Sequence, residues 1–405
     1  MGKGRYFCYV PAIGQYVRGL GFLLVAGGLA WSHSLISVGV GLLAVGVLAD
    51  RRMWGLLGEG GLMRLHLPFV GLYVLHALSW FYTENAEQWW VEMRIKLPML
   101  FLLPAAAVSW HGLPPLWRKV SLVAFHGSVL SVGLLTLGKV LANPTWALEE
   151  MRHSRYVPMV GGISHIYYAG LVGVGVLGLW IFPHGRVVRY VLLGLYAGVL
   201  HGLALRTGLV ALYLTGALGL GWTVGRRNRL WAAAVLGAGM LGVVLLVRYF
   251  PPLRARWESL KEDLASYRPG GYITYASVGR RLAALEASWC VFLRSPLWGV
   301  GIADNQDAVF AQIPRLPYQW DKEWYILPHN QFVEYAVGLG LIGLGVFALF
   351  WVGALRERLG LLWVLWLVYW FLLLQGEAFL ERQVGITAFL WGTGWVWAQL
   401  KAAKS

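Results

Sequence analysis

Long apolar runs separated by short polar clusters dominate the chain. Most runs approach the roughly 20 apolar residues that a helix needs to cross a bilayer. We therefore expect twelve membrane-spanning helices, at residues 12–31, 34–49, 66–82, 97–110, 120–141, 162–182, 189–205, 207–224, 230–249, 332–352, 359–375 and 384–400. The second and fourth spans are short. We expect the fourth to continue an interfacial helix that starts at residue 86.

One apolar run is too long for a single crossing. The 35 residues from Tyr190 to Val224 are interrupted only by His201 and Arg206. As one helix they would extend about 52 Å, whereas the hydrocarbon core is about 30 Å thick. The segment must therefore fold back, and we expect the turn at residues 205–208. This turn places Arg206 at a membrane surface between two helices.

Composition supports the membrane interpretation. Apolar residues make up 58% of the 405 residues and charged residues only 13%, more apolar surface than a soluble protein of this length can bury. The 23 Trp and 19 Tyr residues suit a protein with two water–lipid interfaces.

The net charge of +15 follows the predicted topology. With the N-terminus inside, the inner segments carry 17 of the 34 Lys and Arg residues but only three of the 19 acidic residues. Basic residues favour the cytoplasmic side, so both termini are predicted to be cytoplasmic. The charge needs no nucleic-acid partner.

The longest polar stretch, residues 250–331, then lies outside and contains a predicted helix at 278–293. We expect three regions: spans one to nine in residues 1–249, a periplasmic loop in 250–331, and spans ten to twelve in 332–405. The expected fold is an all-α membrane protein with about twelve transmembrane helices and one large periplasmic loop containing helices, between spans nine and ten. Loops of this length are usually functional.

Several classes of function are disfavoured. No acidic residue lies in the middle of a span, although ion-coupled transporters usually need carboxylates there. The two cysteines, Cys8 and Cys290, are predicted on opposite faces, and no His or Asp cluster has metal-ligand spacing. We therefore expect no metal and no cofactor. The glycine-rich stretch SPLWGVGIADN at 295–305 lacks the Lys-Ser/Thr of a nucleotide loop and is interpreted as a turn.

Basic residues gather where spans meet the outer face. These are Arg94 and Lys96, Arg206, and the loop pair Arg280 and Arg281. Several Arg side chains together can hold a diphosphate through forked hydrogen bonds, although snorkelling toward lipid headgroups is the commoner use of any one of them. Arg206 is the strongest candidate because it interrupts an apolar run on the face where basic residues are disfavoured.

Two histidines could act in catalysis. His329 and Asn330 precede the tenth span, and the ordinary pKa of histidine suits it to general-base catalysis. His165 lies at the outer start of the sixth span. Glu377, Glu381 and Arg382 cluster before the twelfth span and could pair with basic residues or contact a polar ligand. A boundary histidine alone is more often structural.

Three stretches together resemble the O-antigen ligase and polymerase superfamily of membrane glycosyltransferases, most closely the ligases. They are LRTGLVALYL at 205–214, RRLAALEASWCVFLRSPLWGVGIADNQD at 280–307 and HNQFVEYAVGLGLIGLGVF at 329–347. IKLPMLFLLP at 95–104, SHIYYAGL at 164–171 and GEAFLERQVG at 376–385 add support. Each motif is weak alone, but their order is fairly specific. Relatives often have Pro or Thr after the histidine of SHIYYAG, which leaves the role of His165 open.

The resemblance implies a reaction at the periplasmic face of the bacterial inner membrane. The donor would be a glycan on undecaprenyl diphosphate and the acceptor the lipid A–core oligosaccharide, with inversion at the anomeric carbon and no metal. Arg206 and Arg281 would bind the diphosphate. From their place at the outer face, Arg280, Lys96 and Arg94 are further candidates for diphosphate binding. His329 would lie at the reaction centre. Five further residues are candidates for acceptor-binding or supporting roles: Asn330, His165, Glu377, Glu381 and Arg382.

Three alternatives remain open at this point. A repeat-unit polymerase of the same superfamily uses the same donor with another acceptor, and a protein-directed oligosaccharide ligase transfers the glycan to a protein. A transporter or channel is the alternative from a different class. The single large external loop favours the ligase, because polymerases tend to have two.

Overall fold

The computed structural model describes residues 6–50, 54–55, 58–152, 157–226 and 228–404. Helices account for 80% of the chain, and the described residues contain no strand, which confirms the all-α class. Five basic residues used for the predicted orientation, Lys3, Arg5, Arg51, Arg52 and Arg227, lie outside the described residues.

The helices follow the apolar pattern of the sequence closely. Those that coincide with predicted spans are α1 (Tyr6–Gly28), α2 (His33–Leu48), α4 (Gly60–Leu78), α6 (Leu102–Gly112), α7 (Pro115–Ala142), α9 (His165–Ile181), α10 (Arg186–Gly202), α11 (Arg206–Gly225), α12 (Arg229–Tyr249), α16 (Gln331–Arg356), α17 (Leu361–Gly376) and α18 (Gln383–Ala402). The others are α5 (Ala86–Lys96), α8 (Pro144–Arg152), α13 (Pro251–Ser266), α14 (Ser277–Phe292) and α15 (Asn305–Gln312).

Five helical segments are long and apolar enough to cross a bilayer. They are Gly60–Phe81, Pro115–Ala142, Arg206–Gly225, Arg229–Tyr249 and Gln331–Arg356. Three shorter apolar helices, α2, α9 and α17, accompany them. The chain is therefore a membrane protein, and the full count of twelve crossings stays a prediction.

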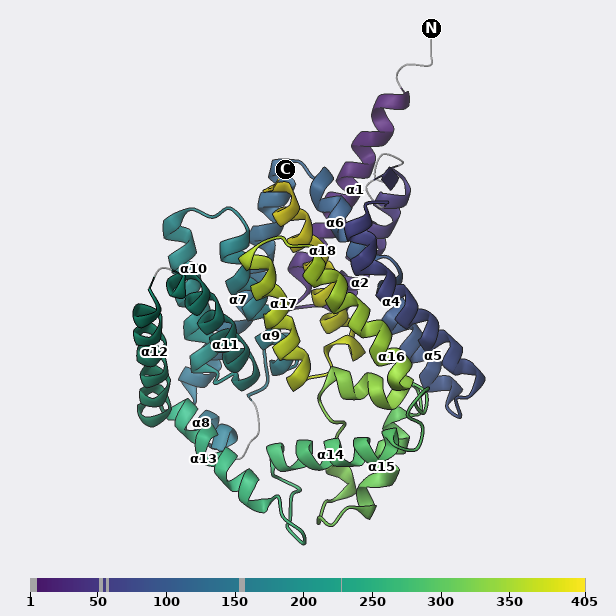
Figure 1. Cartoon of the computed structure of the whole chain (residues 1–405). Helices are drawn as coiled ribbons and strands as arrows, with labels where there is room; N and C mark the ends of the chain where they lie inside the picture. Colours follow the sequence, from purple (N-terminus) through teal and green to yellow (C-terminus); the bar gives the residue numbers. More distant parts are fainter. Residues whose placement is uncertain (1–5, 51–53, 56–57, 153–156, 227, 405) are drawn as a thin grey trace.

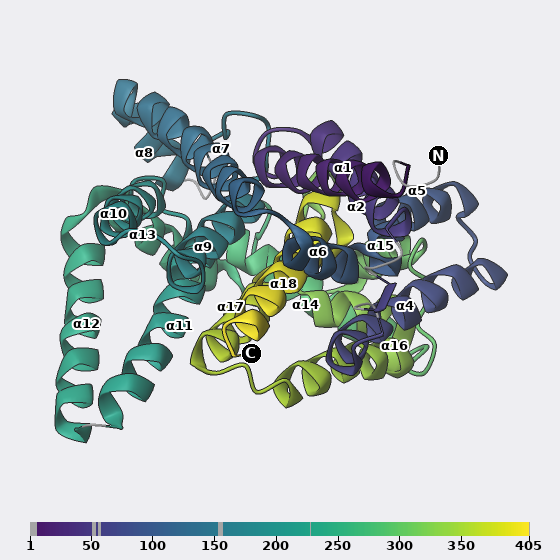
Figure 2. The same cartoon turned by 90° about the horizontal axis from the view of Figure 1, so that it is seen from above.

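The two ends of the molecule differ in character. α1 begins and α18 ends near one end, whereas α13, α14 and α15 lie at the opposite end (Figure 1). Residues 250–331 thus form a separate layer beneath the ends of the long helices. Seen from above, α12 lies at the periphery beside α11 (Figure 2), and none of its most apolar window is buried. Its surface is that of a helix facing lipid.

Two local expectations differ from the structure. The helix that starts at Ala86 ends at Lys96, and a short 3-10 segment with Pro98 separates it from α6. A proline removes a backbone donor and cannot continue the preceding helix without strain, so α5 and α6 are distinct. The turn after α10 lies slightly earlier than predicted, around Ala204 with φ 48°. Arg206 consequently becomes the first residue of α11.

The glycine-rich stretch at 295–305 docks on a kink in α16. Gly340 has φ 64° and ψ −160° inside that helix, which leaves backbone groups without partners in the helix itself. Leu341 donates to the carbonyl of Pro296 at 2.8 Å, and Val300 donates to Val337 at 2.8 Å. A Cβ on Gly340 would lie 2.3 Å from the carbonyl carbon of Leu297. Gly340 therefore lets the loop approach α16 closely. Backbone groups of the loop then form hydrogen bonds with helix groups that the kink leaves without partners in α16.

Candidate functional site

A cavity of about 580 Å³ lies where the layer of residues 250–331 meets the ends of the long helices. Four arginines and two histidines line it, contributed by α9, α11, α13, α14 and the segment before α16: His165, Arg206, Arg256, Arg280, Arg281 and His329. Apolar side chains, including Ile166, Val210 and Leu372, line the rest. A cationic rim beside an apolar wall suits an amphiphile with an anionic head.

Arg206 reaches the cavity from the first residue of α11. Its Nη2 donates to the hydroxyl of Ser277 at 3.3 Å, so the guanidinium bridges α11 and the start of α14. No side chain caps the N-terminus of α11. Uncapped backbone N–H groups at a helix N-terminus attract anions. Arg206 and this helix end thus offer two adjacent positive features to a phosphate.

Arg280 and Arg281 enter the cavity from α14. Arg281 donates through Nη1 to the carbonyl of Gly376 at 3.4 Å, and Arg280 donates to the carbonyl of Trp324 at 3.4 Å. Both are long contacts to neutral acceptors, which leave guanidinium donors available. Burial lowers the pKa of Arg281, and the carboxylate of Glu377 opposes this effect.

Arg256, on α13, was not singled out from the sequence. Only 6% of its surface is exposed, and its Nη1 donates to the carbonyl of Met151 at 3.1 Å. Burial and the charge of Arg206 lower the pKa of Arg256, and Asp263 opposes them. The missed signal was the spacing of Arg256, Ser259 and Asp263, which puts three polar residues on the buried face of one helix.

The four guanidinium groups are costly to hold together without an anion. Arg206 and Arg281 repel each other, as do Arg206 and Arg256. Asp263 partly balances them, but its carboxylate also accepts from the backbone N–H of Val278 at 2.9 Å in the first turn of α14. Since arginine stays protonated at physiological pH, an anionic ligand would relieve this repulsion.

His329 lies at the cavity edge and pairs with Glu377. The distance from His329 Nδ1 to Glu377 Oε2 is 2.8 Å, with Glu377 10% exposed. A carboxylate only accepts, so Nδ1 carries the proton and Nε2 is left as the proton acceptor. His329 has φ 50°, a conformation that costs free energy in a non-glycine residue and often occurs at functional sites.

Asn330 fixes the start of the helix that follows His329. Its side-chain oxygen accepts from the backbone N–H of Phe332 at 2.9 Å and of Val333 at 3.2 Å. Its amide nitrogen donates to Gln375, at 3.0 Å to the side chain and 3.3 Å to the carbonyl. Asn330 therefore caps α16 and ties it to the end of α17, which keeps His329 and Glu377 together.

His165 is the first residue of α9 and lines the same cavity. Its ring interacts electrostatically with Arg256, Arg281 and Arg206. A neutral imidazole there offers one donor and one acceptor beside the arginines. The structure thus brings both candidate histidines to one site, from segments far apart in the sequence.

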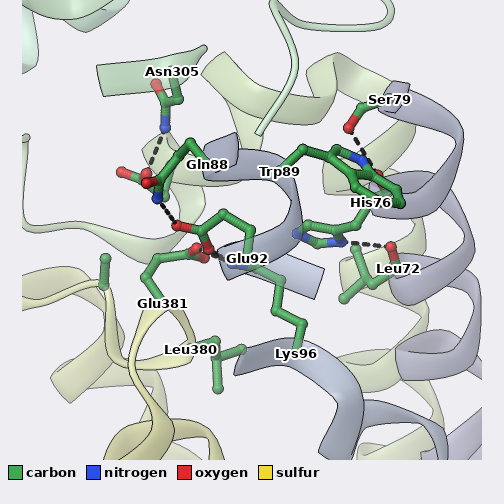
Figure 3. Close-up of polar contacts among 12 residues, drawn as sticks. Leu72, His76, Ser79, Gln88, Trp89, Glu92, Lys96, Asn305, Leu380 and Glu381 are labelled. Carbon is green, nitrogen blue, oxygen red and sulfur yellow. Dashed lines mark hydrogen bonds and ion pairs between the residues drawn. The ribbon is translucent and has the colours of Figure 1, made fainter. Parts of the chain in front are cut away.

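Lys96 and Glu381 lie in a separate buried network. Lys96 is fully buried and pairs with Glu92 at 2.5 Å and with Glu381 at 2.6 Å, and Figure 3 shows the three side chains together. Burial disfavours the charge of Lys96, but Glu381 and Glu92 outweigh it and raise the pKa of the ammonium group. Gln331 donates to Glu381 at 2.8 Å and accepts from the backbone N–H of Leu380 at 2.7 Å.

This network holds the segment that carries Glu377. The carbonyl of Gly376 accepts a hydrogen bond from Arg281, and the carboxylate of Glu377 accepts one from His329. The carboxylate of Glu381 accepts one from Lys96. Two further candidates, Arg94 and Arg382, are exposed. Lys96, Glu381, Arg94 and Arg382 do not line the cavity. The sequence-predicted residues thus divide into a cavity group and a surrounding group.

Comparison with known proteins identifies the segment that carries most of this site. Residues 191–348 match the family described as O-antigen ligase, and none of the curated proteins compared with the chain matches it. The matched segment contains Arg206, Arg256, Arg281 and His329. Residues 191–348 are therefore similar to the O-antigen ligase superfamily, whose members are membrane glycosyltransferase-like enzymes of O-antigen processing.

Proposed function

We propose that the protein is an O-antigen ligase of the bacterial inner membrane. It transfers a glycan from undecaprenyl diphosphate to the lipid A–core oligosaccharide at the periplasmic face. The observation that carries this proposal is the convergence of four arginines and His329, which pairs with Glu377, on one cavity with an apolar wall. The family match at residues 191–348 supports the same reaction class.

The arginines bind the donor. Arg206, Arg256 and Arg281 hold the diphosphate, and Arg280 covers its outer side. Ile166, Val210 and Leu372 extend the cavity between the spanning helices, where the first isoprene units of the lipid lie. As the bond between the anomeric carbon and the diphosphate oxygen breaks, negative charge grows on the diphosphate. Fixed cationic donors in a low-dielectric site stabilise that charge strongly, the role that a divalent ion plays elsewhere.

His329 activates the acceptor. Its Nε2 takes the proton of an acceptor hydroxyl, whose oxygen then bonds to the anomeric carbon on the face opposite the diphosphate. Glu377 orients the ring and stabilises the imidazolium that forms. The products are the glycosylated acceptor, with inverted configuration, and undecaprenyl diphosphate. The proton passes from His329 to solvent.

Purified protein tests the proposal in a transfer assay with lipid-linked glycan and excess chelator. We expect glycan to appear on lipid A–core oligosaccharide without added metal. Glycan that lengthens on the lipid carrier instead would identify a polymerase, and transfer only to protein a protein-directed ligase. Activity lost in chelator and restored by magnesium or manganese would contradict the arginine-based mechanism. Absence of any transfer would contradict the enzyme assignment.

A further inference from the structure

Three aromatic side chains form an exposed ridge beside the cavity. Tyr272 and Tyr275 are 48% and 63% exposed, and Trp324 is partly exposed. The ring centroids of Tyr272 and Tyr275 are 6.1 Å apart, and those of Tyr275 and Trp324 are 5.6 Å apart. A contiguous group of exposed aromatic rings is a candidate binding surface.

The ridge is held rigidly from below. Ile273, between the two tyrosines, is fully buried, and its N–H donates to the carbonyl of Gln319 at 3.0 Å. Asp321 accepts from the Tyr272 hydroxyl at 2.7 Å and from Thr274 at 3.1 Å. These contacts tie residues 271–274 to residues 319–321. A surface ordered in advance loses little entropy when a ligand binds.

Arg280 joins the ridge to the cavity. Its guanidinium carbon lies 5.3 Å from the centre of the Trp324 ring, and the same residue lines the cavity. A chain of sugars attached to a diphosphate near Arg206 and Arg281 can therefore leave past Arg280 and continue over Trp324 toward Tyr275. The ridge is continuous with the reaction site.

We propose that Tyr272, Tyr275 and Trp324 bind pyranose rings of a glycan substrate. The inference rests on the proposed transfer function. The C–H groups on one face of a pyranose carry partial positive charge, and the faces of aromatic rings are negative. Tyr and Trp also supply a wide, stiff contact area at low entropic cost.

The surroundings favour a sugar over a lipid surface. The exposed neighbours Asp321, Lys322 and Glu323 provide carboxylate and ammonium groups for hydroxyls, and their mixed charge does not attract anionic headgroups. The loop between α13 and α14, which carries Tyr272 and Tyr275, lies at the tip of the molecule farthest from the long helices (Figure 1). The glycan over the ridge belongs to the donor or to the acceptor, and both present pyranose rings.

Kinetics of Tyr275→Ala and Trp324→Ala test the ridge and distinguish the two sources. In one arm the donor carries either a single sugar or several repeat units, with a fixed acceptor. In the other arm the acceptor core is full or truncated, with a fixed donor. We expect KM to rise about 2- to 10-fold for the long substrate of one arm, with kcat and the short substrate unaffected. The arm that responds identifies the source.

Matched variants exclude a general effect. Tyr275→Phe keeps the ring and should restore the wild-type KM, and Trp289→Ala removes a 59% exposed ring elsewhere on α14 and should change nothing. A KM equal to wild type for every substrate would overturn the proposal. An equal rise in KM for short and long substrates would also overturn it, because it would reflect damage to the cavity. A loss of vesicle association alone would overturn it as well, because it would indicate membrane docking.

A binding measurement separates this inference from the proposed function. Saturation-transfer NMR uses the repeat-unit oligosaccharide, released from its lipid carrier by mild acid, and the core oligosaccharide released from lipid A. We expect signal from one of them with wild-type protein and a weaker signal with Tyr275→Ala. Absence of signal from both would overturn the ridge as a glycan site even if transfer occurs. Signal without transfer would leave the ridge standing and count against the transfer function.

Discussion

At the scale of single residues, the site combines arginines whose like charges repel one another with a histidine whose position is fixed by its neighbours. Four guanidinium groups share a cavity in which Asp263 acts on Arg206, Arg256 and Arg280 and Glu377 acts on Arg281. An anionic ligand would lower the repulsion that remains among them. His329 is fixed by Glu377 on one side and by the cap at Asn330 on the other. The proposed function therefore assigns binding and proton transfer to different residues, which substitution can separate.

Arg206 is expected to act in donor binding through the shape of its side chain as well as its charge. Arg206→Lys keeps the positive charge but loses the forked N–H donors of the guanidinium group, so this variant should be poorly tolerated. Loss of one such contact could cost about 2–4 kcal/mol, or roughly 30- to 1000-fold in rate. Arg206→Ala should also weaken donor binding, measured with purified protein and lipid-linked glycan. The exposed Arg254, paired with Glu258 at 3.0 Å, provides the control Arg254→Ala, and equal binding by both variants would refute the role of Arg206.

At the scale of elements, two features hold the site together from outside it. The glycine-rich loop at 295–301 fills a kink in α16, and the Lys96 network anchors residues 376–381. Neither contacts the expected substrate, yet the first holds α16, which His329 precedes, and the second holds residues 376–381, which include Glu377. Their substitution should therefore affect stability before it affects chemistry.

Gly340→Ala should destabilise the protein. The new Cβ would meet Leu297 at 2.3 Å, and alanine disfavours the φ of 64°, so we expect a loss of about 1–3 kcal/mol. The measurement is the apparent Tm in detergent. Gly345→Ala in the same helix adds its Cβ in open space and should leave Tm unchanged or raise it. Similar Tm values for the two variants would show that the kink is not required.

Lys96→Met should be destabilising because it leaves Glu92 and Glu381 without their cation. Breaking a buried ion pair at one partner costs about 3–5 kcal/mol, whereas replacing all partners by neutral groups is often tolerated. The triple variant Lys96→Met, Glu92→Gln, Glu381→Gln should thus recover most of the lost Tm. If the single variant is as stable as wild type, Lys96 is not the anchor of this segment.

At the scale of the whole molecule, the helices were predictable and the connections among them were not. Apolar runs long enough for a bilayer identify helices because their length and composition are set by the membrane. One of the two partners of Lys96 is Glu381, 285 residues away in the sequence. Only the folded chain reveals that Lys96 and Glu381 pair with each other and do not line the cavity. Arg256 escaped notice because an arginine in a polar segment is ordinary until its burial is known.

The predicted orientation can be tested by thiol labelling of intact cells. Cys290 on α14 is partly exposed and should react with a membrane-impermeant reagent, because residues 250–331 are predicted to be periplasmic. Cys8, near the start of α1, should not react. Cys8→Ser and Cys290→Ser assign any signal to one residue. Reaction at Cys8 without reaction at Cys290 would reverse the orientation.

The central claim is that the arginines bind the donor while His329 carries out the proton transfer. Donor binding and glycan transfer measured side by side on purified His329→Ala test it most directly. General-base catalysis typically contributes 100- to 10,000-fold, so we expect transfer to fall by about that factor while donor affinity stays close to wild type. Transfer by His329→Ala at the wild-type rate would contradict the account, because His329 would then not be the base.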